Sequence, residues 1–286
     1  MCNASPLHSK RARQQGFTLV ELIMVIVIMG VIGGMVSVFM RSPIDAYFST
    51  ARRASLADAA DSTLRRMSRD IRKALPNSIV VAGDARCVDF IPTKTGGRYR
   101  ADDTNAGLKF NAPDDTFNML GSNPTDADQT IQIGDVVVVY NQGITGSDAY
   151  AGDTTAAISG VAAAVGANPA ETTITIASKL FPLASPGNRF HVVPAGERVV
   201  SYACTSQGTL VRAVNTASTA KNCQTGGVVT PSASVQVNVM AQKVSACSFV
   251  YDSSAQRDGL LRLSLQMTDS GETVSLQHQI HVDNTP

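Results

Sequence analysis

The chain has 286 residues, of which 24 are basic and 23 acidic, and its formal net charge is +1. This balance lacks the clustered basic excess of nucleic-acid-binding proteins, so we expect no nucleic-acid partner. The length allows a soluble domain with a sizeable core in addition to a membrane segment.

Residues 1–16 form a short polar leader that contains Lys10, Arg11 and Arg13 and ends at Gly16. The leader holds three of the 24 basic residues and none of the acidic ones, so the positive charge is concentrated at this end. Basic residues beside a membrane span stay on the cytoplasmic side. We therefore expect a single-pass membrane protein whose remaining domain is extracytoplasmic.

An apolar run from Phe17 to Met40 follows the leader, and Glu21 is its single ionisable residue. As a helix with a rise of ~1.5 Å per residue, this run would cross a hydrocarbon layer of ~30 Å. A secretory signal peptide has a shorter apolar core and is cut after that core. Here the small residue Gly16 lies before the apolar run, so cleavage there would keep the span.

Glu21 is a costly residue in an apolar segment. A carboxylate at the centre of a bilayer costs ~2.5–3.5 kcal/mol on insertion scales and is usually paired. One interpretation is an interfacial residue whose side chain reaches the headgroups. In the other, cleavage after Gly16 frees the amine of Phe17, one helical turn away, and Glu21 pairs with this amine or with that of a neighbouring subunit. We favour a neighbouring subunit as the partner.

Residues 44–75 are predicted to continue as an amphipathic helix that stops at Leu75-Pro76-Asn77. We expect its apolar stripe to cover the sheet of the protein's own domain. The stripe comprises Ile44, Tyr47, Phe48, Ala51, Leu56, Ala60, Leu64, Met67, Ile71 and Leu75.

Residues 76–286 are predicted to form one β-rich head domain. No strand is followed by a regular crossover helix, so we expect a mainly antiparallel sheet and an α+β fold. The clearest signals are the alternating run at 234–239 and two strands at 260–267 and 273–282 joined through Asp269-Ser270-Gly271. Residues 95–128 and 141–170 are expected to be loop-rich, with one short candidate helix at 159–165.

Four cysteines remain after the leader, Cys87, Cys204, Cys223 and Cys247. An even number in an oxidising compartment predicts two disulfides, for which three pairings exist. We favour Cys204–Cys223, which would close a loop around a predicted hairpin, and Cys87–Cys247 follows by elimination. There is no Cys-x-x-Cys, which disfavours a structural zinc site.

No phosphate-binding loop, nucleophile elbow or zinc-protease motif occurs in the sequence. His278 and His281 lie three apart on a predicted strand and so on opposite faces. The acidic pairs at 102–103, 114–115 and 126/128 are more consistent with solvated turns than with a calcium loop. We predict that the protein is not an enzyme and holds no metal or cofactor.

The run Gly16-Phe17-Thr18-Leu19-Val20-Glu21 resembles the class III signal of type IV pilins and type II secretion pseudopilins. The resemblance implies that a prepilin peptidase cuts after Gly16 and N-methylates Phe17. It also implies that Glu21 pairs with the N-terminal amine of an adjacent subunit. The partners would be other minor and major pilins, the peptidase, the inner-membrane assembly platform and membrane lipid.

Four segments of the head resemble the minor pilins of mannose-sensitive haemagglutinin (MSHA) pilus systems, and the general plan is similar to J-type pseudopilins. These segments are 87–93, 96–100, 189–193 and 200–204. The chain is longer than major pilins and has Val38 where many of them carry a helix-kinking proline. The resemblance therefore implies a minor subunit that helps initiate a filament, with a secretion pseudopilin or a tip-displayed adhesin as alternatives.

Overall fold

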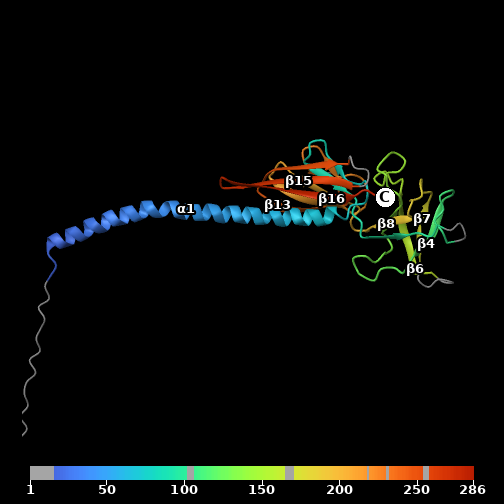
Figure 1. The fold of residues 1–286 in the computed structure, drawn as a ribbon, viewed down its shortest axis with the longest axis horizontal. Helices are drawn as coiled ribbons and strands as arrows, with labels where there is room; N and C mark the ends of the chain where they lie inside the picture. The colour runs from blue at the N-terminus through green and yellow to red at the C-terminus, as the bar shows by residue number, and fades with distance from the viewer. Residues whose placement is uncertain (1–15, 102–105, 165–170, 218, 230–231, 254–257) are drawn as a thin grey trace, which may run out of the picture. The chain divides into compact units, whose positions relative to one another are not determined.

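The computed structural model describes residues 16–286 except 102–105, 165–170, 218, 230–231 and 254–257. The chain divides into two compact units, and the boundary in the sequence lies between Arg52 and Arg53. One 53-residue helix, α1 (Leu19–Ile71), belongs to the first unit up to Arg52 and to the second from Arg53 (Figure 1). The helix continues through Pro43 and ends at Ile71, before the predicted stop at Leu75.

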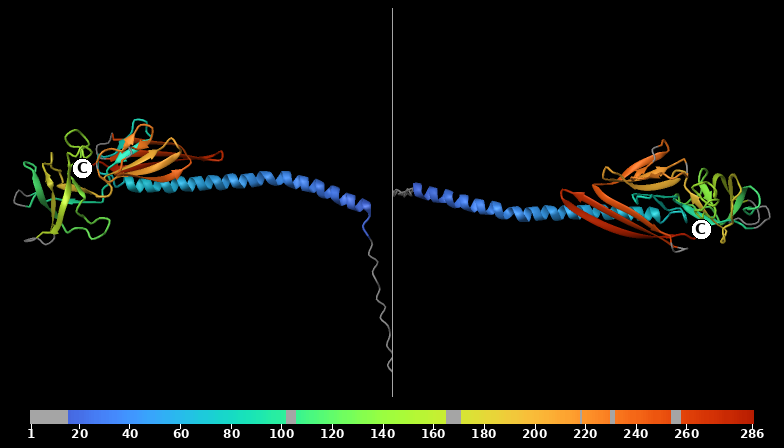
Figure 2. Two further views of the ribbon diagram at one scale, coloured as in Figure 1. Left: turned by 180° about the vertical axis from the view of Figure 1, so that it is seen from behind. Right: turned by 90° about the horizontal axis from the view of Figure 1, so that it is seen from above.

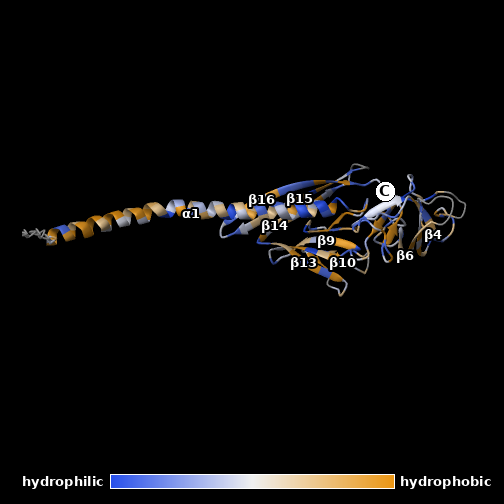
Figure 3. Cartoon of the chain, turned by 90° about the horizontal axis from the view of Figure 1, so that it is seen from below, coloured by the Kyte–Doolittle hydropathy of each residue, from blue (hydrophilic) through white to orange (hydrophobic). Residues whose placement is uncertain are grey.

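In the second unit, one face of α1 packs against two antiparallel sheets, which are drawn above and below the helix in the view of Figure 3. One sheet has five strands in the order β1-β2-β9-β10-β13, and the other has three in the order β14-β15-β16. The prediction of a long apolar N-terminal helix with an antiparallel β domain is confirmed. The strands are β1 (Val80–Val81), β2 (Cys87–Phe90), β9 (Val199–Cys204), β10 (Thr209–Asn215), β13 (Val235–Gln242), β14 (Val244–Asp252), β15 (Asp258–Asp269) and β16 (Glu272–Asp283).

The core of this part forms because α1 presents apolar residues at three- and four-residue steps, which lie on one helix face. Leu56, Ala60, Leu64, Met67 and Ile71 are all buried in one cluster. Side chains from both sheets complete the cluster, among them Phe90, Tyr202, Val214, Phe249, Leu263, Leu265 and Ile280.

A polar contact anchors the last turns of α1 to the five-stranded sheet. The Tyr202 hydroxyl donates to the Asp70 carboxylate at 2.6 Å, and Arg212 Nε donates to the same oxygen at 3.0 Å. Arg212 also donates through Nη2 to both Glu197 carboxylate oxygens at 3.1 Å. Tyr202 is fully buried, so its hydroxyl needs this acceptor.

The predicted hairpin near the C-terminus is confirmed, since β15 and β16 pair in register from Asp258–Asp283 to Asp269–Glu272. Ser270 and Gly271 have φ values of 49° and 86°. Two consecutive positive φ values are typical of a type I′ turn, whose twist matches that of the flanking strands.

A second β structure is inserted between β2 and β9. Its six strands follow the antiparallel order β3-β8-β5-β6-β7-β4, and a bridge between Tyr99 and Met119 brings β3 beside β4. The six strands therefore close into a small barrel, and they lie together beyond the C-terminal end of α1 (Figures 1 and 2). They are β3 (Thr95–Arg98), β4 (Asp114–Leu120), β5 (Val136–Val138), β6 (Thr155–Ala163), β7 (Glu171–Lys179) and β8 (Arg189–Val193).

The barrel has its own apolar core, which includes Tyr99, Phe117, Val137, Ile158, Ile174, Ile176 and Phe190. The expectation of loops with a short helix at 159–165 is wrong for the described residues, because 155–163 is strand β6. The small residues of β6 have low strand propensity, so the sequence pattern did not indicate a strand. In the structure, Ala156 and Ile158 alternate into the barrel core, and β6 pairs with β7. A third cluster joins the barrel to the rest of the unit and comprises Leu75, Ile91, Val136, Val138, Ala149, Val193 and Val199.

The four cysteines form two disulfides, as predicted, but the predicted pairing is wrong. The bonds are Cys87–Cys223 and Cys204–Cys247. Cys87 is in register with Ala203, so it lies on the face of the sheet opposite to Cys204. Cys223 begins the short hairpin β11 (Cys223–Gln224) and β12 (Val228–Val229) on the Cys87 face, whereas Cys204 faces the α1 core together with Cys247.

Candidate functional site: the N-terminal segment

Residues 16–18 precede the helix and have no regular secondary structure. Gly16 is exposed, and no atom lies within 4 Å of the place where a Cβ would be. Phe17 is 86% exposed. The bond between Gly16 and Phe17 therefore lies in accessible, non-helical backbone, which is the conformation that a peptidase requires.

Thr18 caps the start of α1. Its hydroxyl oxygen accepts a hydrogen bond from the backbone N–H of Glu21 at 3.2 Å, and its carbonyl accepts from Leu22 N–H at 3.2 Å. The sequence Thr18-Leu19-Val20-Glu21 has the Thr-x-x-Glu spacing of a capping box. This role of Thr18 was not predicted from the sequence, although the spacing of Thr18 and Glu21 indicates it.

Glu21 lies in the first turn of α1 and is exposed. Among the described residues, its carboxylate has no hydrogen-bond or ion-pair partner. A carboxylate in the first turn interacts favourably with the helix dipole, which is a structural reason for an acidic residue here. The stabilisation by the helix dipole is smaller than the free-energy cost of placing a carboxylate in a membrane, so we expect Glu21 to have a further partner.

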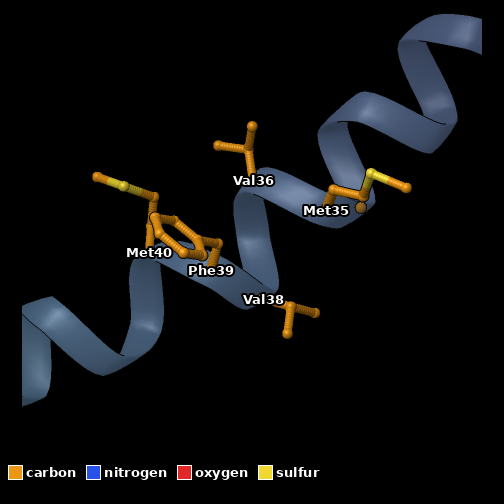
Figure 4. A pocket seen from close by; sticks show the side chains of 6 residues that line it. Met35, Val36, Val38, Phe39 and Met40 are labelled. Atoms are coloured by element: carbon orange, nitrogen blue, oxygen red, sulfur yellow. The ribbon is translucent and has the colours of Figure 1, made fainter.

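All side chains from Phe17 to Phe48 are exposed in the structure. Within the described residues, α1 is the one helix that is long and apolar enough to cross a membrane by length and composition. A shallow hollow on this helix is lined by Gly34, Met35, Val36, Val38, Phe39 and Met40. Their side chains point outward in different directions around the helix (Figure 4), so the hollow is part of an open apolar surface.

The apolar surface extends past the predicted span. Ile44, Tyr47 and Phe48 are exposed, and so is Ala51. The expectation that these four residues cover the head domain is therefore wrong, and burial begins only at Leu56. The pattern was helical, as predicted, but periodicity does not tell which partner covers a helix face.

The histidines and acidic pairs that the sequence suggested as possible ligands do not form a common site among the described residues. His278 and His281 pair with Leu263 and Leu260 and lie on opposite faces of β16. Among the described residues, no group of three or more potential metal ligands lies together. Lys10, Arg11, Arg13 and the pair at 102–103 lie outside the described residues. Asp114 accepts hydrogen bonds from the backbone N–H groups of Lys109 and Asp115.

Residues 11–37 match the family model described as the prokaryotic N-terminal methylation motif. A search of curated proteins and a search of solved structures found no match to the chain. The motif and the apolar helix support a type IV pilin-like or pseudopilin-like protein that is anchored in a membrane. The motif indicates a structural subunit rather than an enzyme.

Proposed function

We propose that this protein is a minor pilin that helps initiate a type IV, MSHA-like pilus at the inner membrane. Its functional counterpart would be the minor pilin O of MSHA systems. Prepilin peptidase would cut after Gly16 and methylate Phe17, and Lys10, Arg11 and Arg13 would hold the leader in the cytoplasm. The head domain would then be periplasmic until the subunit enters the filament.

One observation carries the proposal: the apolar surface of α1 extends from Phe17 past the membrane span to Phe48. A hydrocarbon layer of ~30 Å covers about 20 residues of helix at ~1.5 Å per residue. Ile44, Tyr47 and Phe48 lie beyond that length, and Tyr47 is 70% exposed. Contiguous exposed apolar residues mark interaction sites, and helices of neighbouring subunits would cover these.

Glu21 would then determine how a subunit joins the filament. Cleavage after Gly16 would leave a positive amine on Phe17 of each subunit. The Glu21 carboxylate has no partner within the described chain, and a neighbour's amine would neutralise it in the apolar layer. The unpaired carboxylate thus supports insertion beside a second subunit over an isolated state in the membrane.

The test is complementation of a deletion strain with Glu21→Ala. We expect loss of surface pili, because the variant cannot pair with the neighbouring amine, whereas both disulfides of the head domain should form normally. Asp58→Ala is the matched control, since it removes an exposed carboxylate from the same helix beyond the apolar surface. Normal piliation by Glu21→Ala would contradict the proposed contact.

A J-type pseudopilin of a type II secretion system remains the second candidate, because the same N-terminal motif serves both machines. The deletion strain separates the two functions. Loss of pili with normal export of folded enzymes supports the pilus role, and the reverse result supports the secretion role. Mass spectrometry of the assembled protein should show a chain that starts at methylated Phe17, and retention of residues 1–16 would contradict the proposed processing.

A further inference from the structure

Two arginines lie directly opposite each other on the outer surface of the barrel. In the antiparallel pair β3–β8, Arg98 is in register with Arg189, and both are exposed. Directly opposed residues have Cβ atoms about 4.5–5.5 Å apart, and like charges in this arrangement are destabilising. Among the described residues, neither guanidinium forms an ion pair with a carboxylate. The register thus places two arginines without a carboxylate partner at adjacent positions of the sheet.

Strand β3 carries no side chain at the two positions before Arg98, Gly96 and Gly97. Gly96 lies on the same face as Arg98, and a Cβ on Gly96 would come within 2.7 Å of the Phe190 carbonyl oxygen. A Cβ on Gly97 would come within 2.8 Å of Met119 Sδ inside the barrel. The Phe190 backbone therefore requires glycine at position 96, and a hollow of about 270 Å³ lies over Gly96 and Gly97, lined also by Arg98, Arg189 and His191.

His191 lies beside Gly96 in this hollow, in register with it across the two strands. Its Nδ1 is 3.7 Å from the place where a Cβ on Gly96 would be, so the ring lies next to Gly96. Its Nε2 is buried and has no hydrogen-bond partner among the described residues. Such an unpaired buried atom is unusual in a folded protein.

We propose that this hollow, with Arg98 and Arg189 as its walls and Gly96 as its floor, binds a small oxyanion. The ligand would be a carboxylate, sulfate or phosphate group, either free or at the end of a larger molecule. Guanidinium groups bind such planar or tetrahedral oxyanions through paired N–H donors. A bound anion would also remove the repulsion between the two arginines.

The size of the hollow agrees with this ligand class. Pockets for drug-sized molecules span roughly 300–1,000 Å³. A hollow of about 270 Å³ that is open to solvent suits one charged group better than a whole cofactor. Burial lowers the pKa of His191, Asp283 of β16 opposes this shift and Arg189 adds to it.

The test uses the full-length protein in a neutral detergent, with sodium sulfate as the probe at constant ionic strength. We expect saturable binding by calorimetry and chemical-shift changes centred on the amides of Gly96 and Gly97. Arg98→Gln and Arg189→Gln should each weaken the affinity roughly tenfold, because each removes a charge-assisted pair of hydrogen bonds. Glucuronate and inorganic phosphate, tested next, distinguish a carboxylate from a phosphate ligand.

Arg262→Gln is the matched control, since Arg262 is an exposed arginine on β15. It should leave sulfate affinity unchanged, and an equal loss in this variant would show nonspecific attraction and overturn the proposal. Thermal unfolding gives a second measurement that does not depend on the binding signal. Sulfate should raise the melting temperature of the natural protein but not of the Arg98→Gln/Arg189→Gln variant. Absence of saturable binding to the natural protein would also overturn the site.

Discussion

Asp89 is a carboxylate that is only 1% exposed, on the face of the five-stranded sheet that carries the Cys87–Cys223 bond. It accepts hydrogen bonds from Ser201 Oγ and from the backbone N–H groups of Asn222 and Cys223, the latter at 3.0 Å. Through these hydrogen bonds, Asp89 holds the segment around β11 against the five-stranded sheet, next to the Cys87–Cys223 bond. Burial raises the pKa of Asp89, although these hydrogen bonds and Lys221 oppose the rise.

This shift predicts how stability depends on pH. Because the pKa of Asp89 is higher in the folded chain than its usual 3.8, the folded state binds the proton more tightly than the unfolded state. The contribution of Asp89 to the free energy of unfolding is therefore full below pH 3.8 and is lost as pH rises through the raised pKa. Asp89→Asn lacks this dependence, so its stability relative to the natural protein should improve as pH rises over that interval.

Urea unfolding of the full-length protein in neutral detergent, measured across this pH range, checks the prediction. Asp58→Asn is the control, because Asp58 is an exposed carboxylate on α1. The Asp58→Asn variant should keep the pH dependence that the burial of Asp89 gives the natural protein. Parallel curves for Asp89→Asn and the natural protein would contradict the role given to burial.

At the scale of elements, the two disulfides lie on opposite faces of the five-stranded sheet and attach a different segment to each face. Cys87–Cys223 holds the β11–β12 hairpin on one face, and Cys204–Cys247 joins the sheet to β14 on the α1 side. The first bond spans 136 residues and the second 43. Both restrict the unfolded chain, and loss of a native disulfide typically costs about 2–5 kcal/mol.

We expect a nonreducing digest to give linked peptides that contain Cys87 with Cys223 and Cys204 with Cys247. The paired substitution Cys87→Ser/Cys223→Ser should lower the free energy of unfolding by about 2–5 kcal/mol. It should also leave the Cys204–Cys247 peptide intact, which is the internal control. Recovery of a Cys204–Cys223 peptide from the natural protein would contradict the arrangement of the sheet faces.

The sequence predicted those elements whose signal is local. The turn at Ser270-Gly271 and the stripe from Leu56 to Ile71 follow from residue type and spacing alone, and the structure confirms both. The disulfide pairing could not be predicted from the sequence, because it depends on the strand register that places Cys87 opposite Ala203. The hollow over Gly96 could not be predicted either, because Arg98 lies opposite Arg189 only through the pairing of β3 with β8.

The inserted barrel was missed for a related reason. Its strand β6 consists largely of small residues with low strand propensity, and the flanking segments contain many turn residues. Closure depends on a contact between Tyr99 and Met119, which lie on different strands. Tertiary packing against Ile174 and Ile176 therefore overrides a local preference for loop.

At the scale of the whole molecule, the barrel is an insertion into a sheet that is complete without it. β2 and β9 pair directly, with Phe90 in register with Val200, although the barrel separates them in the sequence. The barrel begins and ends at neighbouring points of that sheet, so a short turn could replace it. The α1 core and both disulfides use no residue of the barrel.

We therefore predict that a chain in which a short Asn-Gly turn joins Thr93 to Arg198 still folds around α1. It should form both disulfides and unfold cooperatively, but with lower stability, because Leu75, Ile91 and Val199 lose the cover of barrel residues. Full exposure of each such side chain costs roughly 1.5–3 kcal/mol. Mass mapping of the disulfides and urea unfolding in neutral detergent check these expectations.

The shortened chain should also lose the sulfate binding proposed for Arg98 and Arg189 while keeping the Glu21 segment intact. If it instead forms mixed disulfides or unfolds without cooperativity, the barrel is required for the head domain to fold, and the insertion is not an independent addition.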